Sequence, residues 1–364
     1  MAILQAGWQK YTLHFKRPSG TSRGILTEKN TWFLLISRVD QPKLIGIGEC
    51  GPLKGLSFDD LSDFEAKLTE VCLHIEEYQD TYQDALKAFP AIQFGLESAL
   101  LDLQAKGTNI LFPSSFTEGK TTIDINGLIW MGSREYMHEQ IKTKLADGFT
   151  CLKMKIGTLD FEQELSLLKG IRREYPAPKE VELRVDANGA FSPQEALEKL
   201  KRLAELELHS IEQPIQAGQI DLMANLCETT PLPIALDEEL IGVTTTEERA
   251  NLLSTIKPQY IILKPTLVGG FKNAEDWISL ANKRNIPWWI TSALESNIGL
   301  NGIAQWTATL DNALPQGLGT GQLYTNNIPS PLVIQNGTLC YDRNKDWDIS
   351  KIESGVCEWV RGAS

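Results

Sequence analysis

The chain has 364 residues, of which 42% are hydrophobic and 23% are charged; such values are typical of a globular protein with a large buried core. Its 47 acidic and 35 basic residues give a formal net charge of −12, which argues against a nucleic-acid partner because it repels phosphate backbones. The sequence has no apolar run of about 18 residues and no signal-peptide pattern near its start, so we expect a cytoplasmic protein without a membrane span.

The six cysteines are far apart, and none forms a C-x-x-C pair: Cys50, Cys72, Cys151, Cys227, Cys340 and Cys357. We therefore expect free thiols, and neither disulfides nor a zinc site. The four histidines offer no metal-ligand pair at helical spacing: His14, His74, His138 and His209.

Residues 1–118 mix strand-like and helix-like segments. The apolar run 31–39 predicts a strand, and 43–53 predicts a strand followed by a turn. Helical spacing of apolar residues marks 61–79 and 91–107, and Gly107 is placed to end the second helix. The region predicts an α+β capping domain without chemistry of its own.

From residue 119 to 330, short apolar runs alternate with helix-like segments. This alternation predicts a parallel sheet. Eight runs indicate closure into a TIM-type (β/α) barrel, and the length suits a barrel of roughly 200–250 residues plus a smaller domain. An open doubly wound sheet is the alternative, but its G-x-G-x-x-G turn is absent. The runs are 121–130, 150–157, 181–189, 209–215, 233–240, 260–270, 286–296 and 314–321.

The C-terminal segment, residues 331–364, contains Asn336 and Gly337 between two strand-like runs. This pair is a strong signal for a tight β-hairpin. We expect the segment to return to the capping domain.

Charged residues recur near the ends of the predicted barrel strands. Asp186, Glu212, Asp237 and Lys264 are separated by 26, 25 and 27 residues, which is the length of one βα unit. The C-terminal ends of parallel barrel strands meet at one mouth, so these side chains should converge there. Unrelated strand-end caps or surface ion pairs would not share such a register.

Asp186, Glu212 and Asp237 would place three negative charges in one pocket. Such a cluster requires raised pKa values or a neutralising cation. Three carboxylates with room for water and substrate suit Mg²⁺, whereas calcium prefers more oxygen ligands and zinc prefers nitrogen or sulfur.

Lys153 and Lys155 precede this series and face the same side of one strand, because they are two residues apart. Lys264 comes four strands later and lies roughly across the barrel. Adjacent ammonium groups near a divalent cation should lower a lysine pKa, so that the amine can act as a base. The metal would stabilise the negative charge left beside a carboxylate.

With these residues in view, the chain resembles the enolase superfamily, in the subgroup typified by muconate-lactonising enzyme. The resemblance spans nearly the whole chain, and it implies a capping domain, a modified barrel and a lysine base with Mg²⁺. Its motifs are K-x-K at 153–155, D-x-N at 186–188, E-Q-P at 212–214, D-E at 237–238 and K-P at 264–265. The stretches 125–130, 184–192, 292–296 and 317–321 are most similar to the o-succinylbenzoate synthase family.

That similarity implies a hydro-lyase of menaquinone biosynthesis, which dehydrates a succinyl-hydroxy-cyclohexadiene-carboxylate to o-succinylbenzoate by syn elimination. Lys155 would remove the α-proton and return it to the leaving hydroxyl. Lys264 would stabilise the enediolate, and Lys153 would support Lys155. Asp186, Glu212 and Asp237 would hold Mg²⁺ against the substrate carboxylate.

The same resemblance suggests substrate contacts for Arg184, Ser292, Gly317 and Gly319. Arg184 lies two residues before Asp186, so the two side chains should face the same side of the strand. Asn188 and Gln213, beside the ligands, would orient them from behind. In the cap, 17–24 and 49–57 are rich in Gly, Ser and Pro and should close over the pocket as loops.

Two rival functions remain open. Dipeptide epimerases and N-acylamino-acid racemases of the superfamily use the same opposed lysines. A dipeptide epimerase commonly has a D-x-D stretch that grips the substrate ammonium, and no such pair occurs in 292–299 or 316–321. A non-catalytic binding protein is the other rival, which the complete set of three ligands and three lysines disfavours.

Overall fold

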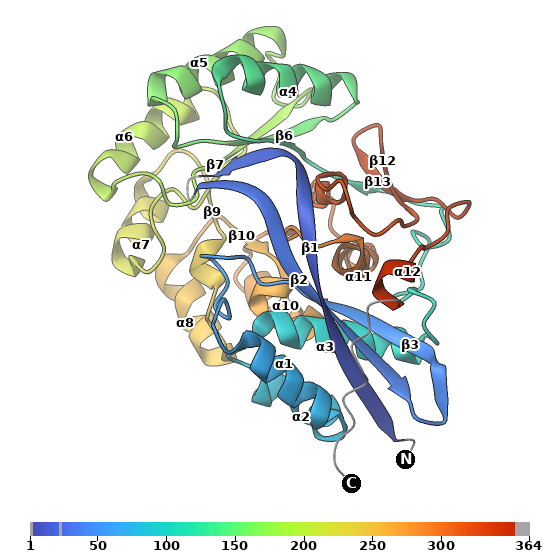
Figure 1. The fold of residues 1–364 in the computed structure, drawn as a ribbon. Coiled ribbons are helices and arrows are strands. Elements are labelled where there is room, and N and C mark those ends of the chain that lie inside the picture. Colours follow the sequence, from blue (N-terminus) through green and yellow to red (C-terminus); the bar gives the residue numbers. More distant parts are fainter. Residues whose placement is uncertain (1–2, 22–23, 354–364) are drawn as a thin grey trace.

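The computed structural model describes residues 3–21 and 24–353. An N-terminal antiparallel sheet with three helices lies against a parallel sheet surrounded by helices (Figure 1). The fold is that of a capping domain on a (β/α) barrel, as the alternating pattern predicted. None of the described helices combines the length and hydrophobicity needed to cross a bilayer.

The capping sheet has the strand order β1-β2-β3, and α3 packs directly on β3. The close approach depends on glycine, because a Cβ on Gly48 would lie only 1.8 Å from the carbonyl oxygen of Gly95. The predicted helix 61–79 is divided at His74 into α1 and α2. The strands are β1 (Leu4–Thr21), β2 (Gly24–Arg38) and β3 (Gln41–Cys50), and the helices are α1 (Phe64–Leu73), α2 (Ile75–Ala85) and α3 (Pro90–Gln104).

Seven of the eight predicted barrel runs form neighbouring parallel strands, with helices between them (Figure 1). The strands are β5 (Gly127–Ile129), β6 (Cys151–Lys155), β7 (Glu182–Asp186), β8 (Ser210–Glu212), β9 (Ile234–Leu236), β10 (Tyr260–Leu263) and β11 (Trp288–Ile290). The helices are α4 (Arg134–Ala146), α5 (Phe161–Glu174), α6 (Pro193–Ala204), α7 (Ile220–Thr229), α8 (Thr246–Ile256), α9 (Pro265–Val268), α10 (Phe271–Asn282) and α11 (Asn297–Thr307).

The eighth predicted run, 314–321, does not form a regular strand. Gln316 and Gly317 instead make single bridges, to Ile125 on one side and to Thr291 after β11 on the other. Pro315 has no N–H to donate, and the glycines that follow weaken a strand. These two bridges link the ends of the seven-stranded sheet.

The predicted C-terminal hairpin is present, with Asn336 and Gly337 at positive φ in its turn. Its strands are β12 (Leu332–Gln335) and β13 (Thr338–Tyr341), and β13 also pairs with β4 (Ile123–Asp124) at the start of the barrel. The hairpin therefore does not join the capping sheet. After the hairpin the C-terminal segment reaches the cap, where Ile352 of α12 (Ser350–Glu353) packs in one buried cluster with Phe33 of β2.

The five described cysteines have free thiols, as expected, and Cys357 lies outside the described residues. Buried carboxyl groups, not thiols, are the unusual feature of the cap. The Asp59 carboxylate accepts the N–H of Ala91 at the start of α3, over 2.8 Å. Burial raises the pKa of Asp59 and of Glu97 to about 7, and that of Asp102 to about 6.

These raised pKa values predict that the chain loses stability as the pH rises. In the unfolded chain Asp59 ionises near its ordinary value of 3.8, whereas the folded chain keeps the proton, so the free energy of unfolding falls until the pH passes about 7. Between pH 3.8 and about 7, we expect the free energy of unfolding to fall by about 2–4 kcal/mol less in Asp59→Asn than in the wild-type protein. Denaturant unfolding at a series of pH values measures it. Asp63→Asn, at an exposed position, should leave the slope unchanged, and an unchanged slope in Asp59→Asn would contradict the assignment.

Candidate active site

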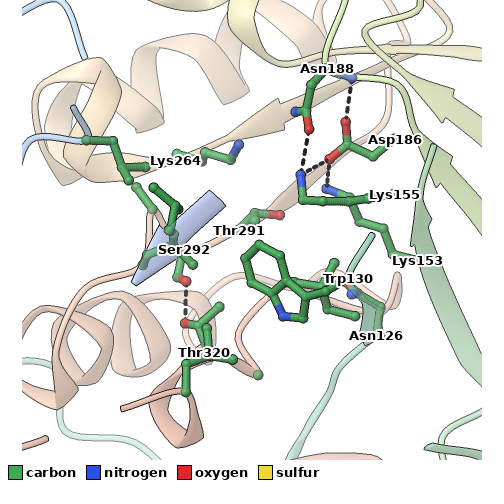
Figure 2. Close-up of a pocket in the computed structure, with 18 of the residues that line it drawn as sticks. Asn126, Trp130, Lys153, Lys155, Asp186, Asn188, Lys264, Thr291, Ser292 and Thr320 are labelled. Carbon is green, nitrogen blue, oxygen red and sulfur yellow. Dashed lines mark hydrogen bonds and ion pairs between the residues drawn. The ribbon is translucent and has the colours of Figure 1, made fainter. Parts of the chain in front are cut away.

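A cavity of about 680 Å³ opens at the C-terminal ends of the barrel strands, and both domains line it (Figure 2). The cap contributes 24–26 and 53–56. Residues 24 and 53–56 belong to the segments 17–24 and 49–57 that were predicted to close over the pocket, whereas 25 and 26 lie just beyond the first of them. The first segment is not the expected loop, because 17–21 belong to β1 and β2 begins at Gly24. Residues 22 and 23 of the first segment lie outside the described residues. The barrel contributes the ends of β5, β6, β7, β10 and β11.

Asp186, Glu212 and Asp237 end or directly follow the adjacent strands β7, β8 and β9. Asp186 and Glu212 are partners in the sheet register. All three carboxylates are at most 3% exposed. The regular spacing in the sequence therefore places Asp186 and Glu212 at one height, as predicted, and Asp237 lies two residues beyond Ala235, the register partner of Glu212.

The three lysines are in direct contact with these carboxylates. Lys155 Nζ lies 2.9 Å from Asp186 Oδ2 and 2.7 Å from Asn188 Oδ1 (Figure 2). Lys153 Nζ lies 3.1 Å from Asp186 Oδ2 and also contacts Glu212. Lys264, which follows β10, contacts Asp237 and lies 3.9 Å from Glu212 Oε1. The six residues thus form one buried network of opposite charges.

The network sets the pKa values of its carboxyl groups in different directions. Burial alone would raise the pKa of Asp186, but Lys153 and Lys155 hold it well below its ordinary value. Burial would likewise raise the pKa of Asp237, but Lys264 lowers it below its ordinary value. Burial and the nearby Asp186 raise the pKa of Glu212 well above its ordinary value.

The pKa values of Lys153 and Lys264 differ from the sequence-based expectation. Burial favours the neutral amine, yet Asp186 and Glu212 raise the pKa of Lys153, and Asp237 and Glu212 raise that of Lys264. The expected lowering depended on the charge of a bound divalent ion. The carboxylates by themselves raise the pKa of Lys153 and Lys264, because each of these two ammonium groups faces an anion at short range.

The donor set fits a magnesium ion. The three acids offer only carboxylate oxygens, which Mg²⁺ prefers. Glu212 Oε1 is buried and accepts no hydrogen bond from the described residues. Within 3–21 and 24–353, no three acidic, histidine or cysteine side chains are placed so that they could hold a metal ion. The lysines contact the carboxylates in this structure. An ion held between them requires Lys153 and Lys264 to move aside, which their flexible stems permit.

Asn188, which lines the cavity, and the fully buried Gln213 make hydrogen bonds to Asp186 and Asp237. The Asn188 N–H donates to Asp186 Oδ1 over 3.0 Å, and its side-chain oxygen accepts from Lys155. The Gln213 side chain donates to Glu239 over 2.9 Å and accepts the N–H of Asp237 over 3.3 Å. Both residues have positive φ, 44° and 40°, which is strained for non-glycine residues. The turns after β7 and β8 are therefore held in unusual conformations beside the carboxylates.

Arg184 does not line the cavity, which corrects the expected substrate contact. Its Nε lies 2.7 Å from Glu182 Oε1, its Nη1 donates to the carbonyl of Pro315 over 2.9 Å, and its guanidinium stacks on Trp289. Arg184 does share a strand face with Asp186, but two residues of strand place it about 7 Å deeper in the barrel. At 2% exposure, it is a core residue that ties β7 to the segment around Pro315.

Ser292, Gly317 and Gly319 do line the cavity. Several uncharged lining residues were not predicted as site residues: Asn126, Leu128, Trp130, Thr291 and Thr320. Leu128 and Trp130 alternate along the end of β5, and the Trp130 ring centre is 6.0 Å from Lys155 Nζ. Their spacing of two residues indicates that both side chains face the same side of the strand. The sequence does not show whether an apolar side chain on that side lines a cavity or packs in the core.

Gly317 occupies a position where a side chain would clash. A Cβ there would lie 2.4 Å from Thr291 Oγ1, whereas a Cβ on Gly319 would have 3.5 Å to its nearest neighbour, Ile125. We expect Gly317→Ala to destabilise the fold by about 1–3 kcal/mol through overpacking. Gly319→Ala should change stability by less than about 0.5 kcal/mol. Denaturant unfolding measures both, and equal losses would contradict the geometry.

The chain is similar to known proteins in both sequence and fold. Residues 136–343 match the family model described as enolase C-terminal domain-like. The chain is 48% identical to o-succinylbenzoate synthase of Desulfotalea psychrophila, over 93% of this chain and 99% of that protein. The crystal structure of MenC from the same organism has a TM-score of 0.80 at 45% identity and covers 93% of this chain and 99% of its own.

More distant structures share the fold. Muconate lactonizing enzyme from Pseudomonas fluorescens has a TM-score of 0.81 at 19% identity, over 98% of this chain and all of that one. The L-Ala-D/L-Glu epimerase from Bacillus subtilis has a TM-score of 0.80 at 19% identity, with both chains fully covered. The chain therefore belongs to the enolase superfamily, in the muconate-lactonising-enzyme subgroup, and within that subgroup it is similar to an o-succinylbenzoate synthase over nearly its whole length.

Proposed function

We propose that the chain is an o-succinylbenzoate synthase, a hydro-lyase that dehydrates a succinyl-hydroxy-cyclohexadiene-carboxylate to o-succinylbenzoate in menaquinone biosynthesis. The observation that carries the proposal is the 48% identity to the Desulfotalea psychrophila enzyme over nearly the whole of both chains. We place the reaction in the cytoplasm.

The charges around the cavity support a dicarboxylate substrate. Five lysines line it, and Asp186 is the single acidic residue among its described lining residues. The cationic residues are Lys54, Lys144, Lys153, Lys155 and Lys264. A substrate with two carboxylates and no ammonium group suits this surface, whereas a dipeptide would need an acidic partner for its amino terminus.

In the proposed mechanism, Lys155 removes the proton from the ring carbon beside the substrate carboxylate. The same ammonium group then gives a proton to the hydroxyl that leaves from that face, so water departs and the ring becomes aromatic. Asn188 holds Lys155 Nζ at 2.7 Å and so directs the amine. Lys153 lies beside it on β6 and balances the charge of Asp186 and Glu212.

Lys264 would stay protonated on the other side of the cavity and stabilise the negative charge that develops on the substrate. Asp186, Glu212 and Asp237 would hold Mg²⁺, which supplies a positive charge for the substrate carboxylate when bound. The cap residues Leu26, Leu53 and Leu56 line the cavity from the opposite side. Closed over the substrate, these apolar side chains would exclude water from the reaction.

A comparison of kcat/KM for three substrates, each assayed separately, tests the proposal. Purified protein with Mg²⁺ is given the cyclohexadiene substrate, L-Ala-L-Glu or an N-succinylamino acid in deuterated water. We expect kcat/KM for dehydration to exceed kcat/KM for dipeptide epimerisation by at least about 100-fold, a difference of about 2.7 kcal/mol in transition-state binding. Epimerisation that exceeds dehydration would overturn the proposal, and a lack of both turnover and deuterium incorporation would favour a binding protein.

A further inference from the structure

A buried polar cluster joins the cap to the barrel beside the cavity. It consists of Lys29 and Thr31 of β2, Glu49 of β3, Thr266 of α9, and Glu295 and Ser296 before α11, and we name it the junction cluster. Lys29 is 6% exposed, and the other five residues are fully buried. None of the six has a part in the proposed proton transfers or metal ligation.

The Glu49 carboxylate is the centre of the junction cluster. It accepts the Thr31 hydroxyl over 2.8 Å, the Ser296 N–H over 2.9 Å, the Ser296 hydroxyl over 2.5 Å and the Gly299 N–H over 2.9 Å. Two of these donors are backbone N–H groups at the start of α11, which need acceptors outside the helix. A cap residue thus fixes the first turn of a barrel helix, across 247 positions of sequence.

Glu295 fixes the segment before that turn. Its carboxylate accepts the N–H of Ala293 over 2.8 Å and the hydroxyl of Thr266 over 2.5 Å. Lys29 Nζ lies 4.0 Å from Glu49 Oε1 and interacts electrostatically with Glu295. Within the described part of the chain Lys29 Nζ has no hydrogen-bond partner, so it acts in the cluster through its charge.

The segment held in this way forms one wall of the cavity, residues 291–294. Leu294 has a φ of +63°, which is unfavourable for a bulky side chain and persists only where the surroundings enforce it. Its carbonyl accepts the Tyr324 hydroxyl over 2.7 Å. The strained wall is therefore held by Tyr324 on one side and by the junction cluster on the other.

We propose that Glu49 and Glu295 are positioning residues through which the cap holds the wall 291–294 in the conformation that binds the dicarboxylate substrate. The same two cap strands carry cavity-lining residues, since β2 begins with 24–26 and β3 is followed by 53–56. The junction cluster thereby ties the cap lining and the barrel wall together. The identity of the substrate rests on the proposed function, whereas the conformation of the wall can be measured without it.

Glu49→Gln tests this role with little change of shape. A glutamine side chain has one acceptor oxygen, so some of the four donors that meet Glu49 lose their partner. We expect hydrogen–deuterium exchange of the amides in 293–299 to accelerate by at least about tenfold. KM for the cyclohexadiene substrate should rise about tenfold, while kcat changes by less than about threefold, because the reacting groups stay in place.

Glu97→Gln is the matched control. Glu97 of α3 is another buried cap carboxylate that reaches a barrel helix, since it accepts the N–H of Phe271 at the start of α10 over 2.7 Å. Phe271 lies away from the cavity lining. In this variant we expect faster exchange at 271–272, with unchanged KM and unchanged exchange at 293–299.

Two results would overturn the proposal: Glu49→Gln with wild-type KM and wild-type exchange, or Glu97→Gln with the same rise in KM. If the wild-type protein fails to turn over the cyclohexadiene substrate, the proposed function is wrong. Faster exchange at 293–299 in Glu49→Gln alone would then still support the positioning of the wall.

Discussion

Replacement of Lys155 by alanine is expected to lower kcat for the dehydration by about 10²–10⁴-fold, which is the range for loss of a general acid–base group. Lys155 both removes and returns a proton in the proposed mechanism, so its loss affects both steps. Its Nζ is the amine held by Asp186 and Asn188 at the edge of the cavity. The growing ultraviolet absorbance of the aromatic product measures the rate.

The control for this variant is Lys201→Met on α6, where the lysine side chain is 54% exposed and the rate should not change. Circular dichroism and the unfolding temperature show whether Lys155→Ala still folds. Turnover by folded Lys155→Ala within about tenfold of the wild-type rate is incompatible with a general acid–base role.

Removal of divalent metal is expected to abolish the dehydration, and added Mg²⁺ should restore it. Glu212→Gln keeps the shape of the side chain but removes one of the three proposed ligand charges. We expect Mg²⁺ to raise the unfolding temperature of the wild-type protein, because a ligand that binds the folded state stabilises it. The same concentration should have no such effect on Glu212→Gln, whose kcat should fall at least about 10³-fold through loss of metal-dependent charge stabilisation.

Glu180→Gln, at an exposed position before β7, is the matched control and should keep both the thermal shift and the rate. Undiminished turnover after chelation, or a wild-type thermal shift in Glu212→Gln, would show that these acids do not hold a required metal.

The sequence predicted the barrel and the grouping of its charged residues because both follow from local repetition. A parallel barrel repeats one βα unit, so residues about 26 apart, such as Asp186 and Glu212, fall at the same height. The pairing of Asp186 with Glu212 in the β7–β8 register confirms that reasoning. The Asn336–Gly337 turn was predictable for the same local reason, because its two positive φ values favour Asn and Gly.

Features that depend on depth or on distant contacts were not predictable. Arg184 shares a strand face with Asp186, but the sequence does not reveal that its guanidinium packs on Trp289 below the cavity. The contact of Glu49 with Ser296 joins separate domains, and neither residue stands in a periodic pattern. The eighth strand was expected from an apolar run, yet Pro315 and the glycines after it leave only two bridges.

The sequence also did not predict which lysines form ion pairs with which acids in the site, or how these pairs change the lysine pKa values. The spacing shows that Lys264 and Asp237 are near one another, but it does not show that they form an ion pair. That pairing raises the lysine pKa against the effect of burial. The direction of such a pKa shift depends on the distances between the charged side chains and on their burial, which only the three-dimensional structure gives.

A crystal structure of this chain grown with Mg²⁺ and o-succinylbenzoate tests the central claim most directly. The account predicts one ion at about 2.0–2.1 Å from oxygens of Asp186, Glu212 and Asp237. It also predicts the product between Lys155 and Lys264, with both ammonium groups turned from the acids toward the ligand. An ion bound elsewhere, or acids still paired with Lys153 and Lys264 while the product occupies the cavity, would contradict it.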